Sequence, residues 1–403
     1  MENISLVILA GGLGTRFLPL TETTPKPLIR IANKPALEHN LEKVAQHFSE
    51  IVLLIGYLKE EVQKYFGDSY KGVPIRYIDQ IEYLGTGHAL NSVKEYITYD
   101  DFILMYGDDL YAPIFVEKLL KIPTSAVIGK VVENWQQFGV FKLKDGNLLD
   151  SIVEKPTEYV GNLVNIGLYK LNKKILPLYD QITKSPRGEF EFTDMLSLFA
   201  KDNPVEVIQV ESGWIPLSYP WDILKANKEL LSVITTNIEG TVEAGVTVKG
   251  ELVLGKGSTI KNGAYLEGNF VIGENCIIGP NCFLKEYASI GNDCVIGNAV
   301  EITRSIIGNK TYIRHLSYVA DSIIGNNVNL AGGTIVSTLK HTETGVKMMI
   351  NGSLVDTGLK KLGTIIGDNA KTGINTSIYP GRKIASGAWT LPGEVVDKDK
   401  EAE

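Results

Sequence analysis

A strict six-residue period in the second half of the chain limits its fold more than any other feature. From Val242 to Ile302 every sixth residue is aliphatic, and glycine follows several of these residues directly. Neither an α-helix nor a twisted antiparallel sheet repeats every six residues, whereas a prism-shaped solenoid does. The periodic residues are Val242, Val248, Leu254, Ile260, Leu266, Ile272, Ile278, Leu284, Ile290, Ile296 and Ile302. The sequence therefore predicts a column of short parallel strands and corners, with these side chains pointing into its shaft.

The period breaks near Ser305 and returns at Ile324 and Ile366, which predicts segments that leave the column. The polar stretch 342–361 is aperiodic. It could reach a neighbouring subunit, but a flexible loop is the simpler interpretation. The charged residues after Pro392 are expected to form a frayed tail. All three cysteines lie four residues after a periodic aliphatic residue, so we expect them to pack inside the column rather than to act in catalysis.

The first half of the chain has a different pattern, in which apolar strand-like runs alternate with amphipathic helical ones. Strands are predicted at 4–10, 51–55 and 102–106, and helices at 35–48 and 89–96. This alternation is typical of an α/β domain with a mainly parallel sheet, which binds ligands at the carboxyl ends of its strands. We expect an α/β domain at 1–234, a solenoid at 235–391 and a tail at 392–403, with a helix over 221–235 as the link.

A glycine-rich turn, with Gly11, Gly12 and Gly14, follows the first predicted strand. Glycine lacks a Cβ, so backbone N–H groups in such a turn can approach an anion closely. Arg16 and Lys26 add positive charge close by. The turn matches neither the dinucleotide-binding G-x-G-x-x-G nor the P-loop pattern. Three glycines alone could be a purely structural turn, but the added charges favour a polyphosphate site.

The string that continues to Lys26 resembles the signature G-G-x-G-T-R-x-x-P-L-T…P-K-P of sugar-1-phosphate nucleotidylyltransferases. The resemblance implies a Rossmann-like domain in which Arg16 and Lys26, as catalytic residues, clamp a nucleoside triphosphate. A second string, Gln80 to Ala89, is similar to the base-reading segment of the bifunctional bacterial enzymes that make UDP-N-acetylglucosamine; within it, Thr86 could also be a helix cap. The nucleotide-binding residues implied by these two strings are Leu9, Gly11, Gly12, Gly14, Thr15, Gln80, Gly85 and Thr86.

Asp108 and Asp109 directly follow another predicted strand. A carboxylate at the carboxyl end of a strand, beside a triphosphate, is well placed to hold Mg²⁺. Asp108 matches the metal-binding Asp of the family, although a loop Asp could also cap a helix, and Asp109 is expected to be solvated. Where relatives carry a second metal-binding carboxylate, this chain has Pro216, with Asp222 displaced from that position. Mg²⁺ would therefore rest on Asp108, phosphate oxygens and water.

Four later strings match, in order, the sugar-binding segments of the same family. By that resemblance, Glu154 and Asn165 hydrogen-bond sugar hydroxyls, and Lys155 meets the sugar phosphate. Gly139 would let the backbone approach the sugar closely. Glu191 is a further sugar-site candidate, although it could be only the N-terminal carboxylate of a helix.

The six-residue period itself resembles the left-handed parallel β-helix of hexapeptide-repeat acyltransferases, which usually assemble as trimers. The string from His315 resembles H-x-x-Y-V-G-D of the acetyltransferase domain in the bifunctional enzymes. A lone His is more often structural, but an imidazole can take the proton from an amine that attacks a thioester. The resemblance implies His315 as general base, acetyl-CoA as co-substrate, and Lys285, Tyr318 and Asn329 as acceptor-binding residues.

This second site departs from the family at its acceptor-phosphate contacts, where Thr303, Thr338 and Thr344 replace Lys or Asn. Each lost charge-assisted hydrogen bond is worth roughly 1.5–3 kcal/mol. Nearby cations that could compensate are Arg304, Lys340 and Lys347.

The expected reaction transfers a nucleotidyl group from UTP or dTTP to glucose-1-phosphate or N-acetylglucosamine-1-phosphate and releases pyrophosphate; Gln80 and Gly85 favour UTP. The second half would N-acetylate an amino-sugar 1-phosphate. One alternative is a single-activity nucleotidylyltransferase whose β-helix only oligomerises. Another is a non-catalytic regulatory subunit that binds nucleotide sugars, an interpretation that Pro216 supports.

Composition narrows the partners and the compartment. The 403 residues carry a net charge of −7, which argues against nucleic acid as the main partner. No apolar run reaches membrane-spanning length, and no secretory leader is evident. Three cysteines are too few for a disulfide framework and lack zinc-binding spacing. A cytoplasmic enzyme is expected, as a homotrimer or higher homo-oligomer.

Overall fold

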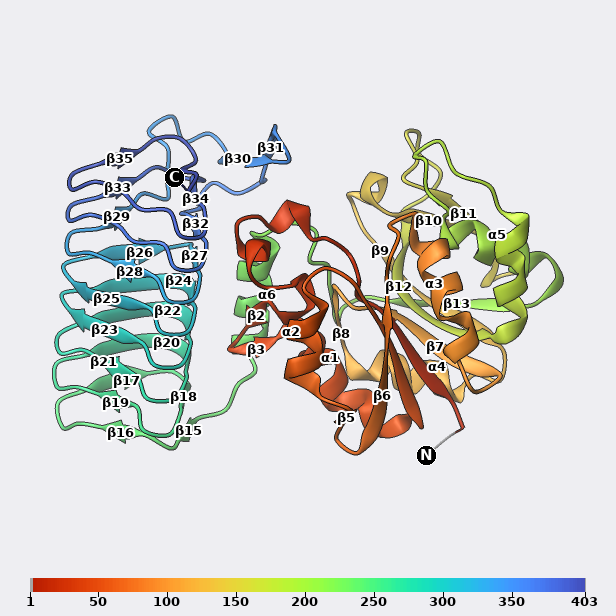
Figure 1. Ribbon diagram of the computed structural model, residues 1–403, viewed down its shortest axis with the longest axis horizontal. Coiled ribbons are helices and arrows are strands. Elements are labelled where there is room, and N and C mark those ends of the chain that lie inside the picture. The colour runs from red at the N-terminus through yellow and green to blue at the C-terminus, as the bar shows by residue number, and fades with distance from the viewer. Residues whose placement is uncertain (1–2, 403) are drawn as a thin grey trace. The chain divides into compact units, whose positions relative to one another are not determined.

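The computed structural model of the protein describes residues 3–402, which form two compact units (Figure 1). The first unit holds the chain up to Leu13, together with Pro25–Leu28 and Ala36–Pro216. The second unit holds Gly14–Thr24, Ile29–Pro35 and the chain from Leu217 onward. The unit boundary therefore cuts through the glycine-rich signature.

A ten-stranded mixed sheet forms the centre of the first unit. In sheet order its strands are β10 (Gly139–Lys144), β11 (Leu148–Glu154), β13 (Val205–Val210), β9 (Ser125–Val131), β12 (Leu163–Asn172), β7 (Asp101–Tyr106), β1 (Ser5–Leu9), β4 (Glu50–Ile55), β6 (Val73–Asp79) and β5 (Ser69–Tyr70). The three strands expected from the sequence are present, and the Rossmann-like parallel order β7-β1-β4-β6 is confirmed. The pair β9–β13 is parallel as well, but β12 runs antiparallel to both of its neighbours, β7 and β9, so the sheet as a whole is mixed rather than mainly parallel.

Helices cover both faces of this sheet, because its central strands are apolar on both sides. In β1, Leu6 and Ile8 pack into one buried cluster and Val7 into the other. The helices are α1 (Ala36–Val44), α2 (Lys59–Phe66) and α4 (Pro113–Lys121) with the first cluster, and α3 (Thr86–Val93) and α5 (Phe192–Asp202) with the second. The carboxyl ends of the strands are thereby left for ligands.

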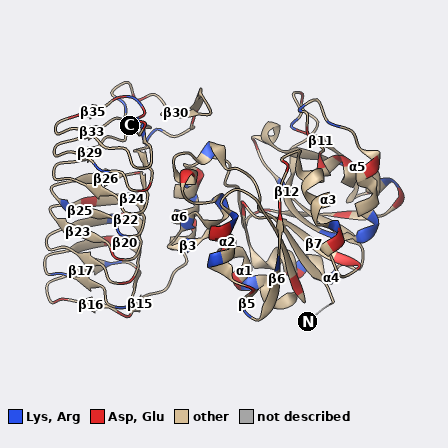
Figure 2. Cartoon of the chain, in the orientation of Figure 1, with Lys and Arg blue, Asp and Glu red and all other residues tan. Residues whose placement is uncertain are grey.

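Acidic and basic side chains are intermixed over the helices of the first unit, as α2 and α5 show (Figure 2). Within residues 3–402, every helix is too short or too polar to cross a membrane.

The second unit is a column of parallel strands that pair across successive coils (Figure 1). One sheet contains β15 (Asn237–Ile238), β18 (Leu252–Leu254), β20 (Tyr265–Ile272), β22 (Phe283–Ile290), β24 (Glu301–Ile307), β26 (Tyr318–Ala320), β29 (Ile335–Val336), β33 (Ser377–Ile378) and β35 (Val395–Val396). A second sheet contains β16 (Thr241–Val242), β19 (Thr259–Ile260), β21 (Ile277–Ile278), β23 (Val295–Asn298), β25 (Tyr312–His315) and β28 (Asn329–Leu330). The column sheet that contains β15 also includes β17 (Thr247–Lys249), β27 (Ile323–Ile324), β32 (Ile365–Ile366) and β34 (Lys383–Ile384). This parallel stacking is consistent with the predicted β-helix, whose handedness stays a prediction.

The periodic aliphatic residues from Leu254 to Ile302 are buried in one cluster along the shaft, as predicted. Val242 is 37% exposed, since it lies at the open end of the column, and Val248 is only partly buried. All three cysteines are buried, and the Cys294 N–H donates to Cys276 Sγ at 3.4 Å across adjacent coils.

A ladder of side-chain hydrogen bonds runs along one corner of the column. In each rung, a side-chain oxygen accepts a hydrogen bond from the backbone N–H of the preceding coil. Asn292 Oδ1 accepts from the Glu274 N–H at 2.9 Å, and Asn309 Oδ1 accepts from the Asn292 N–H at 2.8 Å. Asn326 Oδ1 accepts from the Asn309 N–H at 2.9 Å, and Asp368 Oδ1 accepts from the Asn326 N–H at 2.7 Å. We call Asn292, Asn309, Asn326 and Asp368 the corner ladder. Its partners are 17 or 18 residues apart, except in the last rung, where 42 residues separate them.

Two segments that we expected to be irregular are ordered. Within 342–361, β30 (Lys347–Ile350) and β31 (Ser353–Asp356) form an antiparallel hairpin, so the expectation of a flexible loop is wrong. Alternate residues of its first arm, Met348 and Ile350, are buried. The frayed tail is also wrong, because β35 pairs with β33 and the Lys400 N–H donates to Lys383 O at 2.8 Å.

Candidate active site

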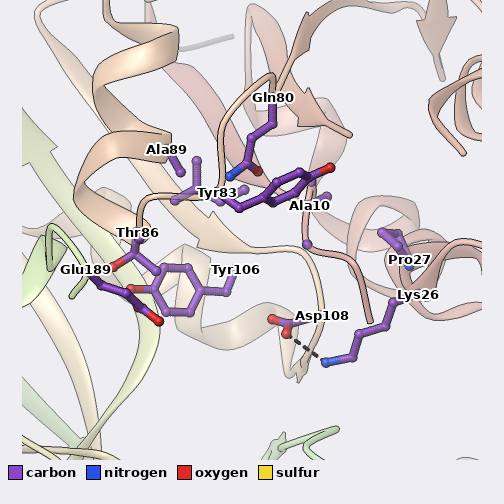
Figure 3. A pocket seen from close by; sticks show the side chains of 14 residues that line it. Ala10, Lys26, Pro27, Gln80, Tyr83, Thr86, Ala89, Tyr106, Asp108 and Glu189 are labelled. Atoms are coloured by element: carbon purple, nitrogen blue, oxygen red, sulfur yellow. Dashed lines mark hydrogen bonds and ion pairs between the residues drawn. The ribbon is translucent and has the colours of Figure 1, made fainter. Parts of the chain in front are cut away.

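A cavity of about 390 Å³ opens at the carboxyl ends of β1 and β7 (Figure 3). Its lining brings together eight of the predicted site residues: Leu9, Gly11, Gly12, Lys26, Gln80, Gly85, Thr86 and Asp108. Tyr83, Tyr106 and Glu189, which the sequence analysis did not single out, also line it. The sheet thus gathers segments that are distant in the sequence at one edge, as an α/β fold requires.

Gly11 and Gly12 of the first turn, and Gly56 after β4, differ in how much space a side chain would find. A Cβ on Gly11 would overlap Gln80 Oε1, and one on Gly56 would lie 2.5 Å from Gly11 O. Gly12 differs, because a Cβ there would meet nothing within 4 Å. Packing therefore explains Gly11 and Gly56, whereas the open space at Gly12 is left for whatever enters the cavity.

The loop before α3 is fixed by Gly85, Thr86 and the segment before α5. Gly85 has a φ of +108°, which L side chains rarely adopt. The Gly87 N–H donates to Phe190 O at 2.8 Å, and Thr86 Oγ1 accepts from the Phe192 N–H at 3.1 Å. The Thr86 hydroxyl therefore braces α5 rather than capping α3.

Lys26 and Asp108 form an ion pair inside this cavity. Lys26 Nζ lies 2.7 Å from Asp108 Oδ2, and the two side chains are 14% and 46% exposed (Figure 3). Lys26 begins a short 3₁₀ helix (Lys26–Leu28), and Asp108 follows β7. The pair places one cation and one accessible carboxylate side by side in the lining of this cavity.

Asp108 is the carboxylate that fits Mg²⁺, an ion that keeps several water ligands. Residues 3–402 contain no cluster of three or more His, Cys, Asp or Glu side chains suited to a metal. Asp222 Oδ2 accepts the N–H groups of Ser218 and Tyr219 at 2.9 and 2.7 Å, at the start of α6 (Asp222–Leu231). Asp109, which was expected to be solvated, is partly exposed, and its carboxylate accepts a hydrogen bond from Trp214 Nε1 at 2.9 Å.

A second cavity, of about 190 Å³, contains all five predicted sugar-site residues: Gly139, Glu154, Lys155, Asn165 and Glu191. Thr86, Tyr106 and Glu189 line both cavities, so the two are neighbours. The Asn165 amide is oriented by two hydrogen bonds: Oδ1 accepts from the Gly167 N–H at 3.0 Å, and Nδ2 donates to the Tyr169 hydroxyl at 2.6 Å.

Burial raises the pKa of the Glu154 carboxyl, and the neighbouring Glu191 raises it further, while Lys155 and Arg187 act in the opposite direction. A Cβ on Gly139 would lie 2.8 Å from Glu154 Oε2, so the backbone approaches this carboxylate as closely as only glycine allows. The cavity therefore holds a carboxylate that is costly to keep charged unless a ligand or cation pairs with it.

Arg187 is the functional candidate that the sequence analysis missed. Its Nη1 lies 3.1 Å from Glu191 and 3.6 Å from Glu154, and its Nη2 lies 3.4 Å from Glu189. Glu191 therefore turns toward Arg187 and makes no side-chain cap on α5. The available signal was the position of Arg187 directly before the matched string that begins at Gly188.

The remaining signature residues, Gly14, Thr15 and Arg16, lie in the second unit. Gly14 is left-handed, with a φ of +65°, and its carbonyl accepts from Thr21 Oγ1 at 2.8 Å. The exposed Arg16 guanidinium lies over the Tyr219 ring, 5.6 Å from its centroid. The turn thus presents a cation on an aromatic support.

The predicted acetyl-acceptor residues lie on neighbouring coils. His315 ends β25 and Tyr318 begins β26, so the two flank one corner. Asn329 pairs with Tyr312 of β25, and Lys285 pairs with Thr303. Among them, His315 and Asn329 are exposed. The structure thus places an accessible imidazole beside Tyr318. Lys285 belongs to the same sheet as Tyr318, two coils earlier, because Lys285 pairs with Thr303 and Thr303 with Ala320.

Arg304 is not available to replace the missing phosphate-binding groups. Its guanidinium donates two hydrogen bonds to Asp321, at 2.6 and 2.8 Å, and a further one to Glu286. The Asp321 carboxylate accordingly raises the pKa of Arg304. Lys340 Nζ donates to the Gly345 carbonyl at 3.0 Å.

Comparisons with known proteins identify the family of this chain. A family model described as nucleotidyl transferase matches residues 5–233, and one described as GMPPB C-terminal domain matches residues 266–372. The chain is 41% identical to the "Bifunctional protein GlmU" of Methanocaldococcus jannaschii, over 98% of this chain and 95% of that protein. It is 37% identical to a "Bifunctional sugar-1-phosphate nucleotidylyltransferase/acetyltransferase" of Sulfurisphaera tokodaii, over 97% of each chain.

A crystal structure of UDP-glucose pyrophosphorylase complexed with UDP-glucose superposes with a TM-score of 0.52 at 24% identity, over 57% of this chain and 99% of that one, and shows the shared fold alone. The coverage and identity of the relatives confirm the resemblance that the motifs indicated. This chain therefore belongs to the nucleotidyl transferase family and is a sugar-1-phosphate nucleotidylyltransferase, among relatives named as bifunctional with an acetyltransferase.

Proposed function

We propose that the enzyme transfers a nucleotidyl group from UTP or dTTP to glucose-1-phosphate or N-acetylglucosamine-1-phosphate and releases pyrophosphate. The observation that carries this proposal is the Lys26–Asp108 ion pair in a cavity that adjoins the one containing Glu154 and Asn165. A cation and a carboxylate at the triphosphate end, and neutral and acidic hydrogen-bonding groups at the sugar end, match the two substrates. On this proposal the reaction belongs to residues 1–234.

The chemistry needs little beyond positioning and charge neutralisation. An oxygen of the sugar phosphate attacks the α-phosphorus in line, the bond from that phosphorus to the bridging oxygen breaks, and pyrophosphate leaves. Lys26 and Arg16 neutralise the triphosphate, and Gly12 leaves room for its oxygens. Bound Mg²⁺, held by Asp108, would supply further neutralisation of the leaving group.

Substrate selection follows from the two cavities. Gln80 and Gly85 would meet the base, which favours UTP, and Leu9 and Thr86 line the same cavity. Glu154 and Asn165 would accept and donate hydrogen bonds to sugar hydroxyls, and Lys155 would meet the sugar phosphate. Because Asn165 is already oriented by Tyr169, it can present a fixed pattern to the sugar.

A panel assay tests this proposal. Pyrophosphate release is followed with UTP and with dTTP, each paired with glucose-1-phosphate and N-acetylglucosamine-1-phosphate, in the presence of Mg²⁺. Lys26→Ala should lower kcat/KM at least about 100-fold, because a buried charge-assisted contact is lost. Lys43→Ala, an exposed lysine of α1, is the matched control. Unchanged turnover in Lys26→Ala would overturn the proposal.

We infer a second activity, N-acetylation of an amino-sugar 1-phosphate from acetyl-CoA, for residues 235–391. The supporting observation is the exposed His315 beside Tyr318 at a column corner, together with the names of the relatives. The amine nitrogen attacks the thioester carbonyl, the carbon–sulfur bond breaks, His315 takes the amine proton, and the CoA sulfur receives a proton. Tyr318, Asn329 and Lys285 would bind the acceptor.

Thiol release from acetyl-CoA with glucosamine-1-phosphate tests the second activity. His315→Gln should abolish it, whereas His341→Gln, a change at another exposed histidine, should not. Pyrophosphate release without thiol release in the unaltered enzyme would instead leave a single-activity enzyme with a structural column.

We further propose that the column assembles as a homotrimer. Three large apolar residues, Leu316, Ile374 and Leu391, are 65%, 56% and 57% exposed at the corner that carries His315. Exposed apolar patches of this kind mark protein–protein contacts. Light scattering of the unaltered protein should give a trimer mass, and Ile374→Asp should lower it. The cytoplasm, which supplies nucleoside triphosphates and acetyl-CoA, is the proposed compartment.

A further inference from the structure

The segment Gly14–Thr24, which carries Arg16, is joined to the C-terminal coils within the second unit. The Ser386 N–H donates to Glu22 Oε2 at 2.7 Å across 364 residues of sequence. Thr23 Oγ1 donates to Asp368 Oδ2 at 2.8 Å across 345 residues. A residue proposed to grip the triphosphate therefore sits on a segment anchored by the far end of the chain.

Glu22 accepts a backbone N–H at the coil that follows the corner ladder. Ser386 occupies the position after Asp368, because a Cβ on Gly367 would meet Ser386 just as one on Gly325 would meet Asp368. Each earlier rung takes its acceptor oxygen from the next coil. At Ser386 the backbone N–H donates to the Glu22 carboxylate, so a side chain of the signature segment accepts a corner N–H of this coil.

The rest of this contact is loosely packed. A cavity of about 310 Å³ lies between the segment and the coils, with Thr15, Leu18, Lys383 and Lys400 in its lining. Dense apolar packing therefore does not fix the segment on this side. On this side the segment is held by directional hydrogen bonds, of which the Glu22 bond is charge-assisted, while its Phe17 and Leu20 side chains are buried.

We propose that Glu22 and Thr23 are positioning residues for nucleotidyl transfer, through which Ser386 and Asp368 hold the Arg16 segment in its binding conformation. This inference rests on the proposed contact of Arg16 with the triphosphate. If these hydrogen bonds are removed, the segment becomes mobile and must be ordered when the nucleotide binds. The conformational entropy lost in that step weakens nucleotide binding. The KM for the nucleoside triphosphate then rises, while kcat changes less, since the groups that meet the α-phosphorus and the sugar remain.

The test uses the full-length protein and two readouts. Hydrogen–deuterium exchange of residues 14–24 is measured without substrate, and KM and kcat are measured by pyrophosphate release. Glu22→Ala should speed exchange in this segment and raise the nucleotide KM about tenfold. Glu22→Gln keeps an acceptor oxygen for the Ser386 N–H and should stay near the unaltered enzyme. Thr23→Val and Thr23→Ser form a second pair. Thr23→Val removes the hydroxyl that donates to Asp368 and should act like Glu22→Ala, whereas Thr23→Ser keeps a hydroxyl and should stay near the unaltered enzyme.

Asn292→Ala is the matched control, because it removes a corner-ladder rung that does not touch the segment. It should lower thermal stability without raising exchange at 14–24 or the nucleotide KM. The inference is overturned if Glu22→Ala leaves the exchange rate of residues 14–24 unchanged. It is also overturned if Glu22→Ala leaves the nucleotide KM unchanged although Arg16→Ala raises it. An unchanged KM in Arg16→Ala itself overturns the proposed function, and the exchange data then still decide whether Glu22 holds the segment.

Discussion

Lys26 Nζ and Asp108 Oδ2 lie 2.7 Å apart at the edge of the sheet where β1 and β7 end. Each side chain thereby neutralises the other in the absence of substrate, although each is proposed to serve a different partner during turnover. A triphosphate would draw the ammonium toward its oxygens, and the freed carboxylate would then accept a cation. Nucleotide and metal binding should consequently reinforce each other.

Replacing Asp108 by Asn tests this relationship. The amide keeps the shape of the side chain but loses the charge that attracts Mg²⁺, so kcat should fall about 100-fold or more. The Mg²⁺ concentration needed for half-maximal pyrophosphate release should rise as well. Asp68→Asn, at an exposed carboxylate outside both cavities, is the control. An unchanged Mg²⁺ dependence in Asp108→Asn would remove Asp108 from the metal site.

Gly12 and Gly56 should respond to alanine in different ways. In Gly56→Ala the new Cβ would press on the Gly11 carbonyl, so thermal stability and nucleotide affinity should fall together. In Gly12→Ala the Cβ enters open space, so the melting temperature should stay within about 2 °C while the nucleotide KM rises. Calorimetry and steady-state kinetics on both variants provide the check. A Gly12→Ala enzyme with an unaltered KM would show that the triphosphate does not pass this glycine.

The raised pKa of Glu154 predicts a pH-dependent effect on stability. Because the folded state holds its proton more tightly than the unfolded state, Glu154 lowers stability as the pH rises from the ordinary Glu pKa through the folded value. The penalty is complete above the folded pKa and vanishes below the unfolded one. Glu154→Gln should therefore melt at a higher temperature than the unaltered enzyme at pH 7.5, and the gain should shrink toward pH 4.

The same variant should bind the sugar phosphate less well, because an amide accepts hydrogen bonds more weakly than a carboxylate. Melting curves at several pH values and the KM for the sugar phosphate measure the two effects. A gain in stability that is equal at pH 4 and pH 7.5 would contradict the assigned cause.

Adjacent isoleucines in β21 offer a matched test of the column. Ile278 is fully buried in the shaft, whereas Ile277 is 39% exposed on the outside. Ile278→Ala should lower the free energy of unfolding by about 2–5 kcal/mol, since it leaves a cavity in a packed core. Ile277→Ala should cost about 1 kcal/mol or less. Urea unfolding followed by circular dichroism compares them, and equal losses would show that the period of six does not define the inside.

The regular parts of the fold were predictable because their information is local. A residue that recurs every six positions identifies the column, and alternating strands and helices identify the parallel centre of the sheet. The hairpin β30–β31 was missed although Met348 and Ile350 alternate with more exposed residues, because its polar flanks hid a short strand signal. The antiparallel insertion of β12 has no local signal at all.

The candidate site was predictable where motifs carry it, as for Lys26 and Asp108. Arg187 was missed because its role arises from three carboxylates that the fold gathers around it. The bond between Glu22 and Ser386 was beyond local reasoning, since nothing near either residue indicates a partner 364 positions away. Likewise, only the packed structure distinguishes Gly11, which a neighbour crowds, from Gly12, which faces open space.

Ile323 pairs with Ile365 as if the intervening chain were an ordinary coil, although Asn326 and Asp368 in the same step are 42 residues apart. Strand pairing in the column depends on where the chain re-enters it, and not on the length of the segment that lies outside. An excursion of another length could therefore leave and re-enter the column at this step without changing how its coils pair. The column can therefore carry a new surface segment at this step while the buried residues of its shaft stay the same.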